Sequence, residues 1–273
     1  MAIEFNGPVA FIDLLGFTNF VRQSDPSKLK YLIEKYAEAV ERAMTYHTLP
    51  TGTGDSPLRL RYAVFSDSLV IYEHTSFSDR RQAQVHFERL IGCCSHLSYR
   101  LLELGQPFRG CIAQGDYCVQ HDVEHRGIIV AGKPLLDAYD WEQRLQWIGI
   151  VMHPTVLTRY QPSDPPNRST LDLFANNNEF RHRLMSHRWK KIPLRADKAD
   201  KAETLESSLA ILPVQRKEGP EYKFLCFAES LSNATEMLES LRRRAKDKDI
   251  CRKYEATLEF YKAVQQERSQ LPP

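Results

Sequence analysis

The stretch that decides the fold is Pro8-Val9-Ala10-Phe11-Ile12-Asp13-Leu14-Leu15-Gly16-Phe17. It is an apolar run of strand length that ends at an acidic residue, Asp13, and a glycine, Gly16, follows three residues later. The sequence therefore predicts a buried strand near the start of the chain, with a carboxylate at its end and a turn directly after it.

Helical and strand-like patterns alternate after this first strand. Apolar residues at three- and four-residue intervals predict amphipathic helices, and short apolar runs bounded by turn residues predict strands. The helices are expected at residues 27–48, 79–105 and 135–145, and the strands at 58–65, 68–72, 108–114, 117–121 and 147–152. The resulting order, β-α-β-β-α-β-β-α-β, is typical of an α+β fold with a ferredoxin-like split βαβ core and helices on one face of the sheet.

This unit is expected to close near residue 160, which gives a catalytic-type domain of residues 1–160 and a C-terminal extension of residues 161–273. The extension should pack on the domain or on a dimer. Its pattern predicts a polar helical stretch up to about residue 188, a hairpin between 211–214 and 222–227, and one long charged helix at 233–270.

Composition excludes several classes of protein. The 273 residues are 42% hydrophobic and carry a net charge of +2, so no global field marks a nucleic-acid or membrane binder. No apolar run approaches the roughly 20 residues that cross a bilayer. The six cysteines include no CxxC pair, which predicts reduced, mostly buried thiols in a cytoplasmic protein rather than a zinc site.

Two acidic residues stand where apolar strands stop. Asp13 ends the first strand, and Asp67 lies in the turn between the strands at 58–65 and 68–72. In a split βαβ sheet the first strand lies beside that hairpin, so the two carboxylates should converge. Such a pair repels unless a cation lies between its members, and oxygen ligands favour Mg²⁺ or Mn²⁺. The alternative is structural, because an Asp at a strand end often forms a turn or caps a helix.

Four motifs resemble those of class III nucleotidyl cyclases, in the same order along the chain. Residues 11–18 (Phe-Ile-Asp-Leu-Leu-Gly-Phe-Thr) are similar to the first metal-binding segment, and residues 65–68 (Phe-Ser-Asp-Ser) to the hairpin with the second metal-binding Asp. Residues 109–115 (Arg-Gly-Cys-Ile-Ala-Gln-Gly) resemble the strand whose Arg approaches the phosphates. Residues 132–142 fit the glycine and helix that follow.

The resemblance implies a two-metal site in which Asp13, Asp67 and the Leu14 carbonyl bind two Mn²⁺ or Mg²⁺ ions. Arg109 and a set of backbone amides would hold the β- and γ-phosphates. Those amides belong to Leu15, Gly16, Phe17 and Thr18. The ribose 3′-hydroxyl would attack the α-phosphate and release diphosphate. The family implies a head-to-tail homodimer with its active sites at the interface.

The base-reading residues of the family are missing. The positions of the adenine-reading Lys and Asp hold Ala63 and Ile129, neither of which can hydrogen-bond a base edge. The rest of the pattern looks most like the pyrimidine cyclases of the bacterial Pycsar anti-phage system. That resemblance implies a cytoplasmic, Mn²⁺-dependent enzyme that makes cyclic UMP from UTP, or cyclic CMP from CTP, for a separate effector. UTP is favoured. Tyr62 is the candidate for narrowing the pocket, and it reaches the site only if its strand carries a bulge.

The family's transition-state Asn and Arg are missing as well, since Leu136 and Asp140 occupy their positions. Another cation must therefore stabilise the charged transition state, and Lys133 is favoured for this role over Arg109 and Arg144. The missing pair also favours a second hypothesis, a catalytically silent cyclase-like domain that binds a nucleotide or a partner. A polymerase-like palm domain would share the two Asp residues but needs a template-binding surface, which the near-neutral charge does not supply.

Overall fold

The apolar run at the start of the chain forms β1 (Ile3–Leu14), a central strand of the sheet. The computed structural model describes residues 2–47, 60–73, 80–121, 127–156, 186–189, 192–193, 204–205, 208–213 and 227–269. Within these ranges one eight-stranded sheet runs in the order β2-β3-β1-β4-β6-β10-β7, with β5 paired to β4. A separate pair joins β8 to β9.

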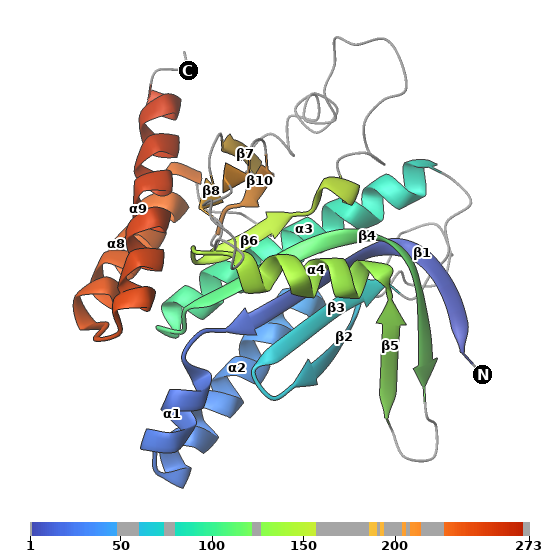
Figure 1. Cartoon of the computed structure of the whole chain (residues 1–273), viewed down its shortest axis with the longest axis horizontal. Coiled ribbons are helices and arrows are strands. Elements are labelled where there is room, and N and C mark those ends of the chain that lie inside the picture. Colours follow the sequence, from blue (N-terminus) through green and yellow to red (C-terminus); the bar gives the residue numbers. More distant parts are fainter. Residues whose placement is uncertain are drawn as a thin grey trace, which may run out of the picture.

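The elements lie as follows. The helices are α1 (Phe17–Gln23), α2 (Pro26–His47), α3 (Arg80–Glu103), α4 (Lys133–Arg144), α8 (Phe227–Arg244) and α9 (Lys248–Ser269). The strands after β1 are β2 (Leu60–Phe65), β3 (Ser68–Glu73), β4 (Phe108–His121), β5 (Ile128–Gly132), β6 (Gly149–Met152), β7 (Ser186–Trp189), β8 (Ile192–Pro193), β9 (Thr204–Leu205) and β10 (Ser208–Ile211). Figure 1 shows these elements with their labels.

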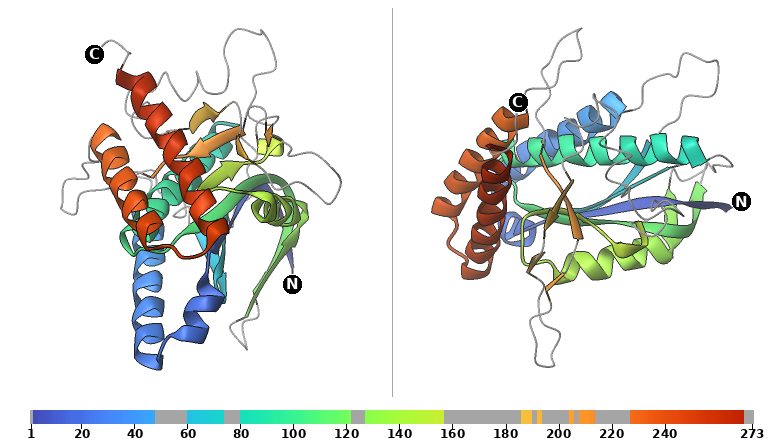
Figure 2. Two further views of the ribbon diagram at one scale, coloured as in Figure 1. Left: turned by 60° about the vertical axis from the view of Figure 1, so that its left-hand side comes forward. Right: turned by 90° about the horizontal axis from the view of Figure 1, so that it is seen from above.

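The predicted α+β fold with a split βαβ core is confirmed, because β1 lies between β3 and β4 while β2 lies at the edge. One detail of the prediction is wrong. Helices cover both faces of the sheet: α2 and α3 lie on one face and α4 on the other, and the α8–α9 hairpin stands at one end (Figure 2).

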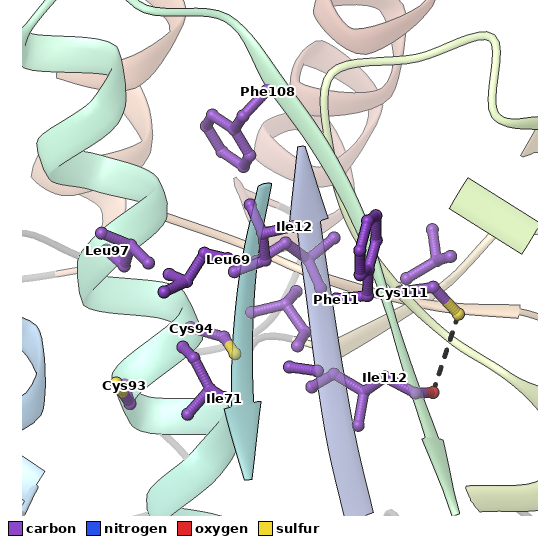
Figure 3. Close-up of a cluster of buried hydrophobic side chains, with 14 of the residues drawn as sticks. Phe11, Ile12, Leu69, Ile71, Cys93, Cys94, Leu97, Phe108, Cys111 and Ile112 are labelled. Atoms are coloured by element: carbon purple, nitrogen blue, oxygen red, sulfur yellow. Dashed lines mark hydrogen bonds between the residues drawn. The ribbon is translucent and has the colours of Figure 1, made fainter. Parts of the chain in front are cut away.

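Strand alternation explains the two faces. Ile12 of β1 and Leu69 of β3 are fully buried and point toward α3, where they meet Leu97 (Figure 3). Phe11 lies on the opposite face, and its ring meets that of Tyr139 in α4 edge to face, with centroids 5.4 Å apart. Asp13, two residues after Phe11, therefore belongs to the α4 face.

Two strand predictions need correction. The stretch around Gly115-Asp116 does not break the chain into two strands, because β4 is continuous and pairs with the whole of β1 in register. This pairing overrides the local turn signal. The strand β5 was not predicted at all, and it forms a ribbon with the second half of β4.

The C-terminal extension also differs from the prediction. The long helix predicted at 233–270 is two helices: α8 ends at Arg244, and Asp247 caps the start of α9. The Asp247 Oδ1 accepts hydrogen bonds from the amides of Asp249 and Ile250 at 2.8 and 3.2 Å. Residues 186–189, placed in a helix by the prediction, form β7. The strand β10 extends the main sheet by pairing with β6, and most of the predicted hairpin partner at 222–227 lies outside the described residues.

Five of the six cysteines lie in the described ranges and all five are free thiols. Cys93, Cys94 and Cys111 are buried, so the prediction of buried cysteines is confirmed for these three. Burial raises the pKa of each thiol. Among the helices that the structure describes, none is both long and apolar enough to cross a membrane.

Candidate active site

Asp13, the penultimate residue of β1, lies between two polar side chains on the α4 face of the sheet. In register it pairs with Ser68 of β3 on one side and with Arg109 of β4 on the other. The Ser68 hydroxyl donates a hydrogen bond to Asp13 Oδ1 at 3.0 Å. The Arg109 guanidinium lies 3.9 Å from Asp13 Oδ2, and the Asp13 side chain keeps 18% of its exposure. A small cation could therefore reach this carboxylate from solvent.

Asp67 lies in the two-residue turn of the β2–β3 hairpin. The flanking residues Phe65 and Ser68 pair directly, and the Asp67 carbonyl accepts a hydrogen bond from the Leu14 amide at 3.0 Å. This bond holds the hairpin tip against the end of β1, one residue beyond Asp13. Ser66, the first turn residue, has a φ of 59°, which is a left-handed conformation. The structure thus brings both predicted acidic residues to one end of the sheet.

The Arg109 side chain is held from the other side by Glu142 of α4. Arg109 Nε forms an ion pair with Glu142 Oε1, and the Glu142 side chain is fully buried. Burial raises the pKa of Glu142 to about 7, although the Arg109 charge acts in the opposite direction. No sequence motif indicated this pair, because Glu142 was only one residue of the helix predicted after Gly132.

Electrostatics at Asp13 favours a bound cation. Burial raises the pKa of Asp13, and the charge of Asp67 raises it further, whereas the Ser68 hydrogen bond and the Arg109 charge lower it. Two carboxylates this close destabilise each other's charged form unless a positive charge offsets them. The oxygen-only donors suit a hard divalent ion. In the described ranges, no group of three His, Cys, Asp or Glu side chains forms a metal site, so water or phosphate oxygens would complete the coordination.

The turn after β1 is only partly available to phosphates. The Leu15 amide donates to the Pro107 carbonyl at 2.8 Å, so the prediction that this amide holds a phosphate is wrong. Gly16 has a φ of 76°, which favours glycine. Helix α1 begins at Phe17, and the first amides of any helix lack intrahelical partners. Phosphate binding by the amides of Gly16, Phe17 and Thr18 stays a prediction.

The C-terminal helix α9 brings a further cation to this end of the sheet. A Cβ atom placed on Gly16 would lie 3.7 Å from Ile250 Cδ1, so the start of α9 packs against the turn after β1. Lys253 follows one helical turn later, partly buried, and its charge acts on Asp13 as well as on Arg109 and Glu142. Sequence reasoning missed Lys253 because it lies far from every motif.

Tyr62 is not brought to the carboxylates. It pairs with Ile71, and the β2–β3 register runs without a bulge, so its side chain lies on the face of α2 and α3. There it lines an apolar cavity of about 530 Å³, together with Phe17 and Tyr36. The hydroxyl of Tyr36 is buried and has no hydrogen-bond partner within the described ranges. Ala63, by contrast, shares the face of Asp13.

Lys133, the predicted transition-state cation, lies at the N-terminal end of α4. Its ammonium donates to both carboxylate oxygens of Asp137 at 2.9 and 2.7 Å. Glu142, which contacts Arg109, is nine residues further along the same helix, and that spacing corresponds to about 13 Å. The structure therefore does not bring Lys133 to Asp13 and Asp67 within the chain.

No protein-family model and no curated protein matches the chain. Solved structures with a similar fold include the adenylyl cyclase CyaB from P. aeruginosa, with 13% identity, a TM-score of 0.48 and coverage of 80% of this chain and 100% of that one. The guanylyl cyclase Cya2 has 12% identity, a TM-score of 0.49 and coverage of 82% and 98%. A class III adenylyl cyclase-like ATP-binding protein from Pseudomonas aeruginosa has 12% identity, a TM-score of 0.47 and coverage of 66% and 41%.

Proposed function

We propose that this chain is a class III-type nucleotidyl cyclase that converts a pyrimidine nucleoside triphosphate to its 3′,5′-cyclic monophosphate. The ribose 3′-oxygen forms a bond to the α-phosphorus, the bond to the β-phosphate oxygen breaks, diphosphate leaves, and the hydroxyl proton is released. One observation carries the proposal: Asp13 and Asp67 lie together at the end of adjacent strands, with Arg109 beside Asp13.

Asp13, Asp67 and the Leu14 carbonyl would hold two Mn²⁺ or Mg²⁺ ions. When bound, such ions lower the pKa of the attacking hydroxyl and neutralise charge on the leaving diphosphate. Ser68 orients the Asp13 carboxylate through its hydrogen bond. Arg109, 13% exposed, would contribute positive charge near the phosphates, with the amides of the turn at residues 16–18 as neutral donors.

A pyrimidine substrate is supported by the residues at the base-reading positions. Ala63 is buried on the face of Asp13, and Ile129 is 62% exposed on β5. Neither side chain can form a hydrogen bond with a base edge. The preference for UTP over CTP rests on the resemblance to Pycsar pyrimidine cyclases, as do the roles in anti-phage defence and in the activation of a separate effector.

A homodimer is part of the proposal. Large apolar side chains are exposed on β5 and α4, namely Ile129, Leu136 and Tyr139, and others on β2, namely Val64 and Phe65. Apolar side chains that gather into a contiguous exposed patch mark interaction sites, and we expect these side chains to contribute to the dimer interface. In a head-to-tail dimer, Lys133 of one subunit would serve the site of the other. Analytical ultracentrifugation should detect a dimer that Leu136→Glu weakens, and a monomeric wild type would contradict this part of the proposal.

The function is tested by incubating the purified protein with Mn²⁺ and an equimolar mixture of ATP, GTP, CTP and UTP, followed by mass spectrometry of the products. Cyclic UMP is expected from wild type and no cyclic product from Asp67→Asn. Cyclic CMP alone would move the assignment to a cytidylate cyclase. Cyclic AMP or cyclic GMP would contradict pyrimidine specificity.

A silent nucleotide-binding domain is the second candidate, and the residues Leu136 and Asp140 at the positions of the family's Asn and Arg favour it. If no cyclic product forms, thermal-shift measurements with each nucleotide and Mn²⁺ distinguish the two candidates. A shift without turnover supports the silent domain.

A further inference from the structure

The cations considered for the candidate site differ in what already binds them. Arg109 forms an ion pair with the buried Glu142, and Lys133 forms one with Asp137. In the described part of the chain, the Lys253 ammonium has no hydrogen bond or ion pair, although Asp13 and Glu142 both lie within reach of its charge. The Lys253 nitrogen is not among the buried side-chain atoms of the described ranges that lack a hydrogen-bond partner, so it is open to solvent, where an incoming anion can reach it.

Helix geometry places Lys253 over the site. Ile250 packs against the Gly16 turn. One turn beyond Lys253, the Thr257 hydroxyl accepts a hydrogen bond from the Ile148 amide at 2.8 Å, and Ile148 precedes Gly149, the register partner of Arg109. Residues at spacings of three and four share a helix face. Lys253 therefore faces the end of the sheet between these two anchors.

We propose that Lys253 binds the polyphosphate of the nucleotide, so that the α8–α9 hairpin forms one wall of the active site. This inference deepens the proposed function and rests on it for the identity of the substrate. It gives the C-terminal extension a direct role in catalysis.

The charges around Lys253 agree with this role. Arg109 is already compensated by Glu142, so it alone does not balance an incoming triphosphate. Burial lowers the pKa of Lys253 and the Arg109 charge lowers it further, whereas the charges of Glu142, Asp249 and Asp247 raise it. A bound polyphosphate would favour the charged form of Lys253. The ammonium is a compact point charge, which suits phosphate oxygens that have no fixed orientation.

Four proteins provide the test: wild type, Lys253→Met, Lys253→Arg and Lys262→Met. Lys262 lies on the same helix and pairs with Glu239 at 3.1 Å, so its replacement removes the same charge away from the site. Isothermal calorimetry with inorganic tripolyphosphate and Mn²⁺ measures binding directly, and steady-state kinetics with UTP separates KM from kcat. Thermal unfolding confirms that each variant is folded.

Lys253→Met is expected to weaken tripolyphosphate binding and to raise the KM for UTP by about ten- to one-hundredfold. Lys253→Arg should keep both within about fivefold of wild type because it retains the charge. Lys262→Met should match wild type. Unchanged tripolyphosphate binding in Lys253→Met, or no binding by wild type, would overturn the inference.

The two proposals can fail separately. If wild type makes no cyclic nucleotide but its tripolyphosphate binding depends on Lys253, the cyclase function is wrong and the polyphosphate site stands. If cyclic UMP forms and Lys253→Met leaves the KM and the tripolyphosphate affinity unchanged, the function stands and the role of Lys253 is wrong. Should Lys253→Met fail to fold, Lys253→Gln replaces it in the same comparison.

Discussion

Glu142 and Arg109 form an ion pair between α4 and β4, and the Glu142 carboxylate has no exposure to solvent. Arg109 also faces Asp13 across the sheet, so a single guanidinium links a buried acid to the acid proposed to bind metal. A buried pair of this kind stabilises little by itself, but the loss of one partner leaves the other charge uncompensated.

The titration of Glu142 should be visible in the pH dependence of the free energy of unfolding. Its pKa is about 7 in the folded protein and about 4.3 in an unfolded chain, so the folded state holds the proton more tightly. Ionisation of Glu142 therefore opposes folding. The stability that comes from tighter proton binding in the folded state is present at low pH and is lost as the pH rises from about 5 through 7. Between pH 5 and 8.5, wild type should lose up to about 3 kcal/mol relative to Glu142→Gln.

Urea unfolding at a series of pH values measures this difference. Glu259→Gln, an exposed change on α9, is the control and should track wild type at every pH. A constant difference between wild type and Glu142→Gln would show that Glu142 does not titrate in this range.

Asp13→Asn should separate activity from stability. Cyclic product formation is expected to fall at least about a hundredfold, since metal chemistry contributes several kcal/mol to such reactions. Burial raises the pKa of Asp13, so its ionised form opposes folding at neutral pH, and the metal-free variant should melt at the same temperature as wild type or above it. Differential scanning calorimetry and a product assay test both points, with the exposed Glu236→Gln on α8 as control. A lower melting temperature in Asp13→Asn would contradict the electrostatic argument.

Ser68→Ala should weaken metal binding. The lost hydrogen bond to Asp13 Oδ1 raises the pKa of Asp13 further and leaves the carboxylate less well oriented. Hydrogen bonds to charged groups are worth about 1.5–3 kcal/mol when well buried, and at this partly exposed position we expect an affinity for Mn²⁺ about five- to twentyfold lower. Calorimetric titration of Mn²⁺ measures it, with the exposed Ser232→Ala on α8 for comparison. Equal affinities would mean that Ser68 plays no part in the site.

Ser66→Gly should stabilise the β2–β3 hairpin. A non-glycine residue with a φ of 59° is strained, and glycine adopts this conformation without that cost. The free energy of unfolding should rise by up to about 1 kcal/mol, part of the gain being offset by the greater freedom of glycine in the unfolded chain. Ser66→Ala should bring no gain. Chemical denaturation of the three proteins gives the answer, and a destabilised Ser66→Gly would contradict the strain argument.

The order of the core elements could be predicted from the sequence because each carries its own local pattern. Residues 108–121 were divided incorrectly because Gly115 and Asp116 are turn residues by local preference. Pairing with Gly7 and Asn6 of β1 holds them in a strand instead. The break at Asp247 could have been found from an acidic residue that precedes a helical pattern.

The candidate site could be predicted where it depends on a strand end or a hairpin tip, as for Asp13 and Asp67. Tyr62 was misplaced because side-chain direction in a strand depends on register, and a bulge had to be assumed. Glu142 and Lys253 could not be predicted, since each reaches the site through the packing of a helix whose position the sequence does not specify.

The Glu142–Arg109 contact also links a surface helix to the candidate site. Glu142 is fixed within α4, whose outer side exposes Leu136. Because the guanidinium is paired with a residue of that helix, the position of α4 helps to set where the Arg109 charge lies relative to Asp13.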